Sequence, residues 1–323
     1  MNQPNNLIRV GVIGVGAMGR NHVRVATACP SMHCVGVFDA HDTAAKQVAN
    51  QYNCSSFRTV EELIESVDAV IVASPTVTHF ELGKKILGAG RHCLMEKPIT
   101  VSVEEGVELD KLAQSKSLIL SVGHIERHNP VYSELQKIVE DQEILAINFR
   151  RLSYNLSRAN DVDVILDLMI HDLDTANVLL PGDLMVAGAI GAAYRSPTLD
   201  YVSAHLMSDC GVSATLSASK ISQVKTRSLE VSCADCFVSV DYLRKDILIN
   251  RHSVGRYTSD ARDVGYRQES LVEQVFVPNV EPLMAEHLDF SKSILEAKAP
   301  LVTAQDGIGA LRLATEIQRK CKL

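Results

Sequence analysis

The stretch VGVIGVGAMGRNH, residues 10–22, decides the fold of this chain. It places Gly14, Gly16 and Gly19 in G-x-G-x-x-G order between a short apolar run and a segment with helical periodicity. The first glycine allows a tight turn, the second lets backbone amides approach a pyrophosphate, and the third lets helix and strand pack closely. The stretch therefore predicts a strand, a dinucleotide-binding loop and a helix whose N-terminus favours phosphate.

Short apolar runs alternate with helical stretches from residue 7 to about residue 123. Strands that alternate with helices form right-handed βαβ units, so the pattern predicts a doubly wound parallel sheet of the Rossmann type. We expect this first, α/β domain to cover residues 1–123. The predicted strands are residues 7–14, 33–39, 69–74, 92–97 and 118–123.

The pattern changes after residue 123. Long segments of alternating apolar and polar residues predict a large, mainly antiparallel sheet, and two helices are expected at 284–298 and 303–320, the second capped by Thr303. Residues 124–323 are thus predicted to form an α+β domain for substrate binding and oligomerisation. One sheet face would remain available for a second subunit, so we expect a homodimer or homotetramer.

Composition excludes several classes of function. The net charge of −7 and the absence of a Lys/Arg run argue against nucleic acid or an anionic membrane as partner. No apolar stretch is long enough to span a bilayer and the N-terminus has no signal pattern, so we expect a cytoplasmic protein. Eight cysteines are too few for a disulfide scaffold. The single CxxC, Cys233 and Cys236, favours a hairpin turn over a metal knuckle.

Asp39 ends the second predicted strand, twenty residues beyond Gly19. A carboxylate there accepts hydrogen bonds from an adenosine ribose and repels a 2'-phosphate, and the following Ala40 and His41 offer no arginine for that phosphate. NAD is therefore the expected cofactor. The alternative is that Asp39 only caps a turn.

Ligands of open α/β sheets bind at the carboxyl ends of the strands. One such end carries Ser74, Pro75 and Thr76, and another carries Glu96, Lys97 and Pro98. A lysine directly after a buried strand is an unusual place for a solvated cation. The proline holds Lys97 extended, and a cis peptide there would aim its side chain in one direction.

The stretch VDVILDLMIHDLD, residues 162–174, inserts polar residues into an apolar helix. Asp163, Asp167, His171 and Asp174 are three or four residues apart and would share one face. The row has three interpretations: the wet side of an amphipathic helix, a catalytic row, or a metal site. No further ligand is evident elsewhere, so no metal is expected.

These motifs, together with TVTHFEL (76–82) and GRHCLMEKPIT (90–100), make the chain resemble the Gfo/Idh/MocA family over nearly its whole length. The resemblance implies an NAD(P)-dependent sugar or cyclitol dehydrogenase. It places Lys97 beside the nicotinamide and gives Asp167 and His171 as the remaining catalytic residues. The expected cofactor-binding residues are Gly14, Val15, Gly16, Ala17, Met18, Gly19, Asp39, Ser74, Pro75, Thr76, His79, Glu96 and Lys97.

Neutral imidazole suits proton removal near neutral pH. We therefore expect His171 to be the general base, Asp167 to orient it, and Lys97 to polarise the substrate oxygen. The strings VGHIERHNP and DVDVILDLMIHDLD resemble UDP-N-acetylglucosamine 3-dehydrogenases more than inositol dehydrogenases, which implies oxidation at C3 of a UDP-N-acetylhexosamine. A free cyclitol or hexose dehydrogenase and a non-catalytic NAD(H) sensor are the alternatives. Expected substrate residues are His124, Arg127, Arg151 and Asp174, with Arg150 and Arg158 as further candidates for the diphosphate.

Overall fold

The computed structural model describes residues 7–154, 162–260 and 263–321, without the side chains of 252–269. Two compact units divide the chain. Unit 1 comprises Met1–Asn129 and Val280–Arg312, and unit 2 comprises Pro130–Asn279 and Leu313–Leu323. The division lies six residues beyond the predicted boundary at 123, and it differs from the prediction by returning residues 280–312 to the first unit. Arg158 lies outside the described residues.

Unit 1 contains a six-stranded sheet in the order β3-β2-β1-β4-β5-β6. All neighbouring strands pair in parallel, which confirms the predicted Rossmann sheet. The order reverses between β1 and β4, and dinucleotides bind at such a reversal. The strands are β1 (Ile8–Ile13), β2 (Met32–Phe38), β3 (Ser55–Ser56), β4 (Ala69–Val72), β5 (His92–Glu96) and β6 (Leu120–Gly123).

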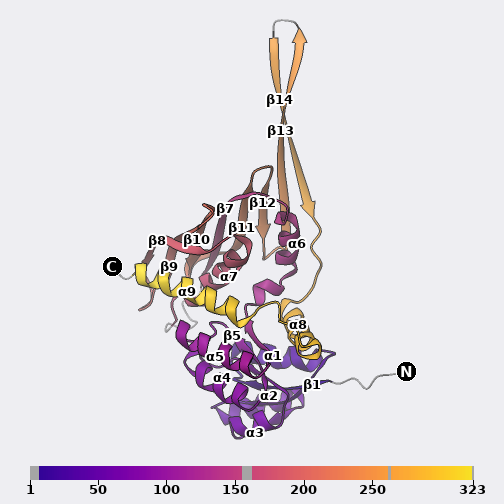
Figure 1. Cartoon of the computed structure of the whole chain (residues 1–323), viewed down its shortest axis with the longest axis vertical. Coiled ribbons are helices and arrows are strands. Elements are labelled where there is room, and N and C mark those ends of the chain that lie inside the picture. The colour runs from indigo at the N-terminus through magenta and orange to yellow at the C-terminus, as the bar shows by residue number, and fades with distance from the viewer. Residues whose placement is uncertain (1–6, 155–161, 261–262, 322–323) are drawn as a thin grey trace, which may run out of the picture. The chain divides into compact units, whose positions relative to one another are not determined.

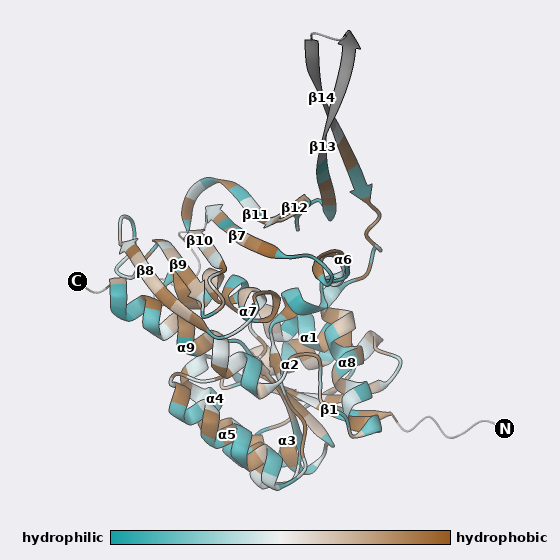
Figure 2. Ribbon diagram, turned by 45° about the horizontal axis from the view of Figure 1, so that its top comes forward, coloured by the Kyte–Doolittle hydropathy of each residue, from teal (hydrophilic) through white to brown (hydrophobic). Residues whose placement is uncertain are grey.

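Two helices of unit 1 begin at residues whose side chains cap them. Ser102 and Glu105 form a reciprocal capping box, and Thr59 accepts a hydrogen bond from the Glu62 amide. Hydrophobic and hydrophilic residues both occur along α4 and α5 (Figure 2), as expected of helices that cover a sheet. The helices are α1 (Ala17–Ala28), α2 (Asp42–Tyr52), α3 (Val60–Glu65), α4 (His79–Gly88), α5 (Val103–Ser115) and α8 (Pro282–Glu296), with short 3-10 turns η1 (Thr76–Thr78) and η2 (Ile125–His128).

Helix α8 explains why residues 280–312 belong to unit 1. Its Phe290 is 0% exposed and packs in the same core cluster as Val10 and Val12 of β1 and Val23 of α1. Burying an aromatic ring of this size contributes on the order of 2–3 kcal/mol. The helix is therefore part of the cofactor-domain core, although it lies far away in the sequence.

Unit 2 is built on an eight-stranded sheet in the order β14-β13-β12-β11-β7-β10-β9-β8. Among its described strand pairs, only β7 and β10 are parallel, which confirms the predicted mainly antiparallel sheet. Figure 1 shows β13 and β14 as a long hairpin that extends beyond the other strands of this sheet. The strands are β7 (Ile144–Tyr154), β8 (Leu184–Ala192), β9 (Tyr201–Ser208), β10 (Ser213–Ser219), β11 (Ile221–Cys233), β12 (Phe237–Asp241), β13 (Asp246–Asp260) and β14 (Asp263–Val275).

One face of this sheet packs against helices. Alternate residues Val202, Ala204 and Leu206 of β9 are buried, and they share a core cluster with residues of α6 (Pro130–Val139) and α7 (Ile170–Leu179). His205 and Met207, at positions that alternate with these, are exposed. Figure 1 shows α6 and α7 against the sheet. The alternation is the pattern of a sheet with one covered face.

Local predictions for the second half are confirmed in two places. Cys233 ends β11 and its N–H donates to the Cys236 carbonyl at 2.9 Å, so the CxxC forms a hairpin turn. Helix α9 (Ala304–Cys321) begins after Thr303, whose hydroxyl accepts from the Asp306 amide at 3.2 Å. Among the described residues, no helix has both the length and the apolar character that a bilayer crossing requires.

Candidate active site

The glycine loop follows β1, and two of its three glycines have a steric reason. Gly14 has φ +86°, in the left-handed region that favours glycine. A Cβ on Gly19 would lie 1.8 Å from the Gly14 carbonyl oxygen, so only glycine lets α1 approach β1 this closely. A Cβ on Gly16 would meet nothing within 4 Å, which leaves its surroundings open for a ligand. These residues fit the pyrophosphate of a dinucleotide.

Asp39 lies directly after β2 and shapes this loop. Its Oδ2 accepts the Val15 N–H at 2.7 Å, and its Oδ1 accepts the His41 N–H at 2.8 Å. A carboxylate has about four acceptor positions, so acceptor capacity remains for ribose hydroxyls. The side chain is half-buried and can meet a ligand. Asp39 therefore does cap the turn through these two hydrogen bonds, and its carboxylate can still accept hydrogen bonds from a ribose.

Two substitutions of Asp39 separate its charge from its hydrogen bonds. Asp39→Asn removes the charge and retains an acceptor, whereas Asp39→Ala also frees the Val15 amide. We expect both variants to raise the ratio of kcat/KM for NADP to that for NAD by about tenfold, equivalent to about 1.4 kcal/mol. Only Asp39→Ala should also weaken NAD binding strongly. Steady-state kinetics with both cofactors measures this, and an unchanged ratio in both variants would refute charge as the cause of the preference.

The ends of β4 and β5 are linked by His79. Its Nδ1 lies 2.9 Å from the Pro98 carbonyl oxygen and its Nε2 lies 3.0 Å from that of Ser74. The side chain is 1% exposed, and burial lowers the pKa of His79, so the ring is neutral. The two nitrogens face backbone carbonyls, and the neutral ring donates to one of them, so His79 helps to hold the two strand ends together. Its predicted cofactor contact stays a prediction. The neighbouring Ser74 hydroxyl bonds that of Thr78 at 2.7 Å.

Glu96 and Lys97 stand at the end of β5, before a cis Lys97–Pro98 peptide. Glu96 Oε2 accepts the Lys97 N–H at 3.1 Å, and Oε1 lies 2.9 Å from His22 Nε2. Burial raises the pKa of the Glu96 carboxyl, but the hydrogen bond with His22 and the charge of Lys97 help to outweigh it and hold the pKa below its ordinary value. Glu96 is therefore an ionised carboxylate beside Lys97.

His124 and Arg127, two predicted substrate residues, follow β6. His124 is 0% exposed, and burial, with the charges of Lys97 and Arg127, lowers its pKa to about 3. Arg127 is 6% exposed, donates to the Leu301 carbonyl at 3.1 Å and lies 3.9 Å from Asp306 Oδ1. Its guanidinium anchors the segment before α9, and the predicted substrate contact of Arg127 stays a prediction. His124 stays a candidate as a neutral ring.

His128, which the sequence analysis did not select, is a source of acid lability. It is 8% exposed, its Nε2 has no hydrogen-bond partner among the described residues, and burial with the Arg127 charge lowers its pKa to about 4. The unfolded chain, in which histidine titrates near 6.5, takes up this proton first as the pH falls. The stability that neutral His128 provides is therefore complete above about pH 6.5 and is lost progressively down to about pH 4.

We expect His128→Phe to reduce this acid lability. Between pH 7 and pH 5 its free energy of unfolding should fall by about 2 kcal/mol less than that of the unmodified protein, since about 1.4 kcal/mol accompanies each pH unit below 6.5. Urea denaturation at the two pH values measures the difference. Parallel pH dependence in both proteins would contradict a buried, neutral His128.

The predicted catalytic helix in unit 2 begins with a π-helical turn η3 (Ile165–Met169) that continues into α7. Asp163 caps it, because its Oδ1 accepts the amides of Ile165 at 3.0 Å and Leu166 at 2.9 Å. Asp174 is 1% exposed, whereas Asp167 and His171 are half-buried. The four residues therefore differ in their exposure to solvent. The row is not simply the wet side of an amphipathic helix, because Asp174 is buried.

Asp167 has a partner that the sequence analysis missed. Lys220 Nζ lies 3.1 Å from Asp167 Oδ2 and donates to the Val162 carbonyl at 2.6 Å. Lys220 is 5% exposed. Buried lysines are rare unless paired, so the contact with Lys220 fixes the position of the Asp167 side chain. The sequence feature that could have pointed to Lys220 is its position as the single lysine in the Ser/Ala-rich stretch SATLSASKIS, 213–222.

Arg151, a predicted substrate residue, forms a buried ion pair. It is 3% exposed, and its Nε and Nη2 donate to Asp172 Oδ1 at 3.0 and 2.6 Å. Asp172 is 4% exposed and belongs to α7, so the pair ties the catalytic helix to β7. The pair gives Arg151 a structural partner, and Asp174 is buried; the predicted substrate contacts of both residues stay predictions. Arg150, its neighbour, is exposed.

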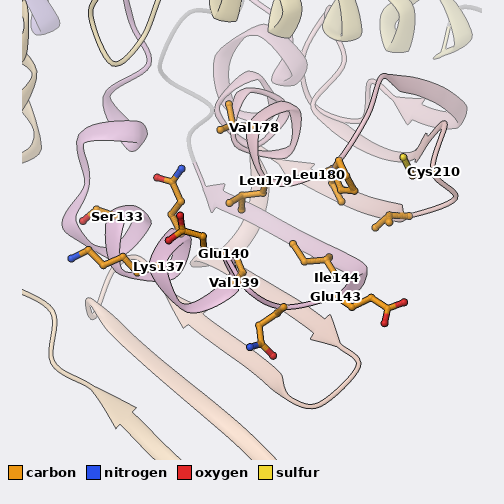
Figure 3. Close-up of a pocket in the computed structure, with 14 residues that line it drawn as sticks. Ser133, Lys137, Val139, Glu140, Glu143, Ile144, Val178, Leu179, Leu180 and Cys210 are labelled. Atoms are coloured by element: carbon orange, nitrogen blue, oxygen red, sulfur yellow. The ribbon is translucent and has the colours of Figure 1, made fainter.

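Unit 2 also contains a pocket of about 800 Å³ (Figure 3). Apolar residues such as Val139, Ile144 and Leu179 line it, with the charged side chains of Lys137, Glu140 and Glu143. None of the predicted catalytic or substrate residues lines this pocket. We assign it no part in the reaction.

A Rossmann sheet, a glycine loop that fits pyrophosphate and an acid after β2 define the class of NAD-binding oxidoreductases. The family model of the Gfo/Idh/MocA oxidoreductases, described as an oxidoreductase family with an NAD-binding Rossmann fold, matches residues 8–124. UDP-N-acetylglucosamine 3-dehydrogenase from Acidithiobacillus ferrooxidans is 34% identical over 96% of both chains. The chain belongs to the Gfo/Idh/MocA family, and its cofactor is a nicotinamide dinucleotide.

Solved structures and a second relative agree with this assignment. A crystal structure of the Acidithiobacillus ferrooxidans enzyme is similar with a TM-score of 0.86, 32% identity and 97% coverage of both chains. Inositol 2-dehydrogenase from Rhizobium meliloti is 28% identical over 66% of this chain and 69% of its own. The predicted family and enzyme class, an oxidoreductase that acts on hydroxyl groups, are confirmed.

Proposed function

We propose that the protein oxidises the C3 hydroxyl of a UDP-N-acetylhexosamine with NAD as hydride acceptor. The observation that supports this most is the similarity to UDP-N-acetylglucosamine 3-dehydrogenase along 96% of both chains. The inositol 2-dehydrogenase similarity is lower and covers 66% of the chain, so it supports a free cyclitol substrate only as a second candidate. Both substrates carry secondary hydroxyls, and the same residues would serve either.

Three side chains are proposed to carry the reaction. Bound NAD, held by the glycine loop and Asp39, would accept hydride from the substrate carbon. His171 takes the hydroxyl proton, and Asp167, fixed by Lys220 at 3.1 Å, stabilises the resulting imidazolium. Lys97, whose charge is favoured by ionised Glu96, polarises the substrate oxygen. The three roles need no metal ion.

A substrate panel tests this proposal. Purified protein is incubated with NAD and UDP-N-acetylglucosamine, UDP-N-acetylgalactosamine, UDP-glucose, N-acetylglucosamine, glucose or myo-inositol, and NADH formation is followed by absorbance. We expect turnover only with the UDP-N-acetylhexosamines. Turnover of myo-inositol alone would favour the second candidate. Thermal stabilisation by NADH, without stabilisation or turnover by any sugar, would indicate a sensor.

A second copy of the chain is the proposed partner, and the cytoplasm is the proposed location. The exposed face of the unit 2 sheet includes Met185, Ile190 and Met207, which are 57%, 78% and 37% exposed. Apolar side chains on an uncovered sheet face favour association. Light scattering should therefore give a mass of two or four chains, and a monomer at micromolar concentration would contradict this prediction.

A further inference from the structure

A row of titratable side chains lies buried in unit 1 next to Glu96. His22 on α1 and His287 on α8 are 0% exposed, Glu286 on α8 is 1% exposed and Glu96 is 9% exposed. His22 contacts Glu96 on one side and His287 on the other. The row thus connects the strand end that carries Lys97 to a helix nearly two hundred residues away.

The geometry of the two imidazoles decides what lies between them. Their rings are nearly parallel, at 13°, and the ring centroids are 5.2 Å apart. His22 Nδ1 and His287 Nε2 are 2.9 Å apart. The rest of the distance between the two ring centroids equals the sum of the two distances from a ring centroid to its nitrogen. The two nitrogens therefore lie on the line that joins the ring centres. The geometry is that of a linear N–H···N hydrogen bond.

This alignment argues against a metal ion, although ligand atoms of His22, Glu286 and His287 lie within 4.8 Å of one another. An ion on the line between the two nitrogens would hold them about 4 Å apart, because a Zn–N bond is about 2.0 Å long. The observed gap accommodates one proton. We therefore interpret the row as a hydrogen-bonded chain.

Ionised Glu96 fixes the direction of the hydrogen bonds in the chain. Since Glu96 Oε1 can only accept, His22 Nε2 carries a proton and donates it. The His22 tautomer that carries its proton on Nε2 has a bare Nδ1, which accepts from His287 Nε2–H. Burial lowers the pKa of His287 well below its ordinary value, so a ring that donates from Nε2 has a bare Nδ1 as well.

Glu286 completes the surroundings of the chain as a neutral acid. Burial and the charges of Glu96 and Asp289 raise its pKa well above the ordinary value. Neither of its oxygens has a hydrogen-bond partner in the part of the chain that the structure describes. The charged groups around the row are thus Lys97, Arg24, Asp289 and Glu96 itself, with neutral His124 and His128 nearby.

We propose that His22 and His287 are positioning residues that hold Glu96 as an ionised, fixed carboxylate and thereby keep Lys97 in its ammonium form. The inference rests on the proposed role of Lys97. An opposite charge close to an ammonium favours its charged form. Without the donor on His22, buried Glu96 would take up a proton, and Lys97 would lose its proton at a lower pH.

Two polar variants of His22 test the positioning role. The amide of His22→Gln can occupy the place of Nε2 and donate to Glu96, whereas the shorter amide of His22→Asn can occupy only the place of Nδ1, which faces His287. We expect His22→Asn to lower kcat about tenfold at high pH and to move the alkaline limb of the kcat profile down by about one pH unit. His22→Gln should restore the profile. Equal profiles in His22→Asn and the unmodified protein would overturn the proposal.

A second measurement needs no substrate. NMR of protein labelled with ¹⁵N-histidine should show His22 and His287 as neutral Nε2–H tautomers and one slowly exchanging proton that correlates with both rings. His287→Leu should abolish that signal. Other tautomers, or a stoichiometric metal found by elemental analysis, would refute the hydrogen-bonded row of Glu96, His22 and His287. If the protein turned over no sugar, the proposed function would be refuted. The NMR result would still decide whether the hydrogen-bonded row of His22 and His287 exists.

Discussion

Lys97→Met is expected to abolish turnover while NADH still binds. Methionine keeps much of the length and apolar stem of lysine but has no charge, so it cannot polarise the substrate oxygen. Loss of one preorganised electrostatic group at a reacting oxygen lowers kcat by about 10³-fold. The glycine loop and Asp39 are unaltered, so NADH affinity, measured by fluorescence titration, should stay close to that of the unmodified protein.

The matched control is Lys111→Met, on α5 of the same unit, where the lysine is exposed. It should retain full activity. His171→Ala is the companion variant in unit 2 and should lose kcat by a comparable factor, because imidazole is the proposed base. Substantial turnover by Lys97→Met would remove Lys97 from the mechanism, and with it the functional basis of the His22–His287 chain.

Local sequence signals were sufficient for the cofactor half of the fold. The glycine spacing and the strand–helix alternation predicted the parallel sheet, because each depends on neighbours within a few residues. The short strand β3 was missed, since Ser55 and Ser56 have no apolar pattern. The sequence did not show that α8 belongs to unit 1, for a different reason. Its amphipathic pattern predicts a helix, but the pattern does not specify whether Phe290 packs in the core of unit 1 or of unit 2.

The predicted site was less complete because its supporting contacts are long-range. Periodicity could place Asp167 and His171 on a helix but could not show that Lys220, 53 positions beyond Asp167, pairs with that acid. Single arginines were equally ambiguous. Arg150 and Arg151 are neighbours on β7, and alternation directs one outward and one into the core, but the sequence did not establish which.

Arg151→Met is expected to destabilise unit 2 strongly. Arg151 and Asp172 are 3% and 4% exposed, and removing the arginine leaves a buried carboxylate without its cation. Breaking a buried pair in this way costs about 3–5 kcal/mol of unfolding free energy. Urea denaturation should show this loss, while Arg150→Met, at the exposed neighbouring position, should change the free energy by less than about 0.5 kcal/mol.

The double variant Arg151→Met/Asp172→Leu separates the pair from the packing. It removes both charges, so we expect it to recover most of the stability that the single variant loses, since a buried ion pair replaced by apolar residues is often neutral or stabilising. If Arg151→Met instead kept its stability but raised the KM for a UDP-sugar, the arginine would be a substrate ligand, as the sequence alone suggested. The burial of both side chains favours the structural outcome.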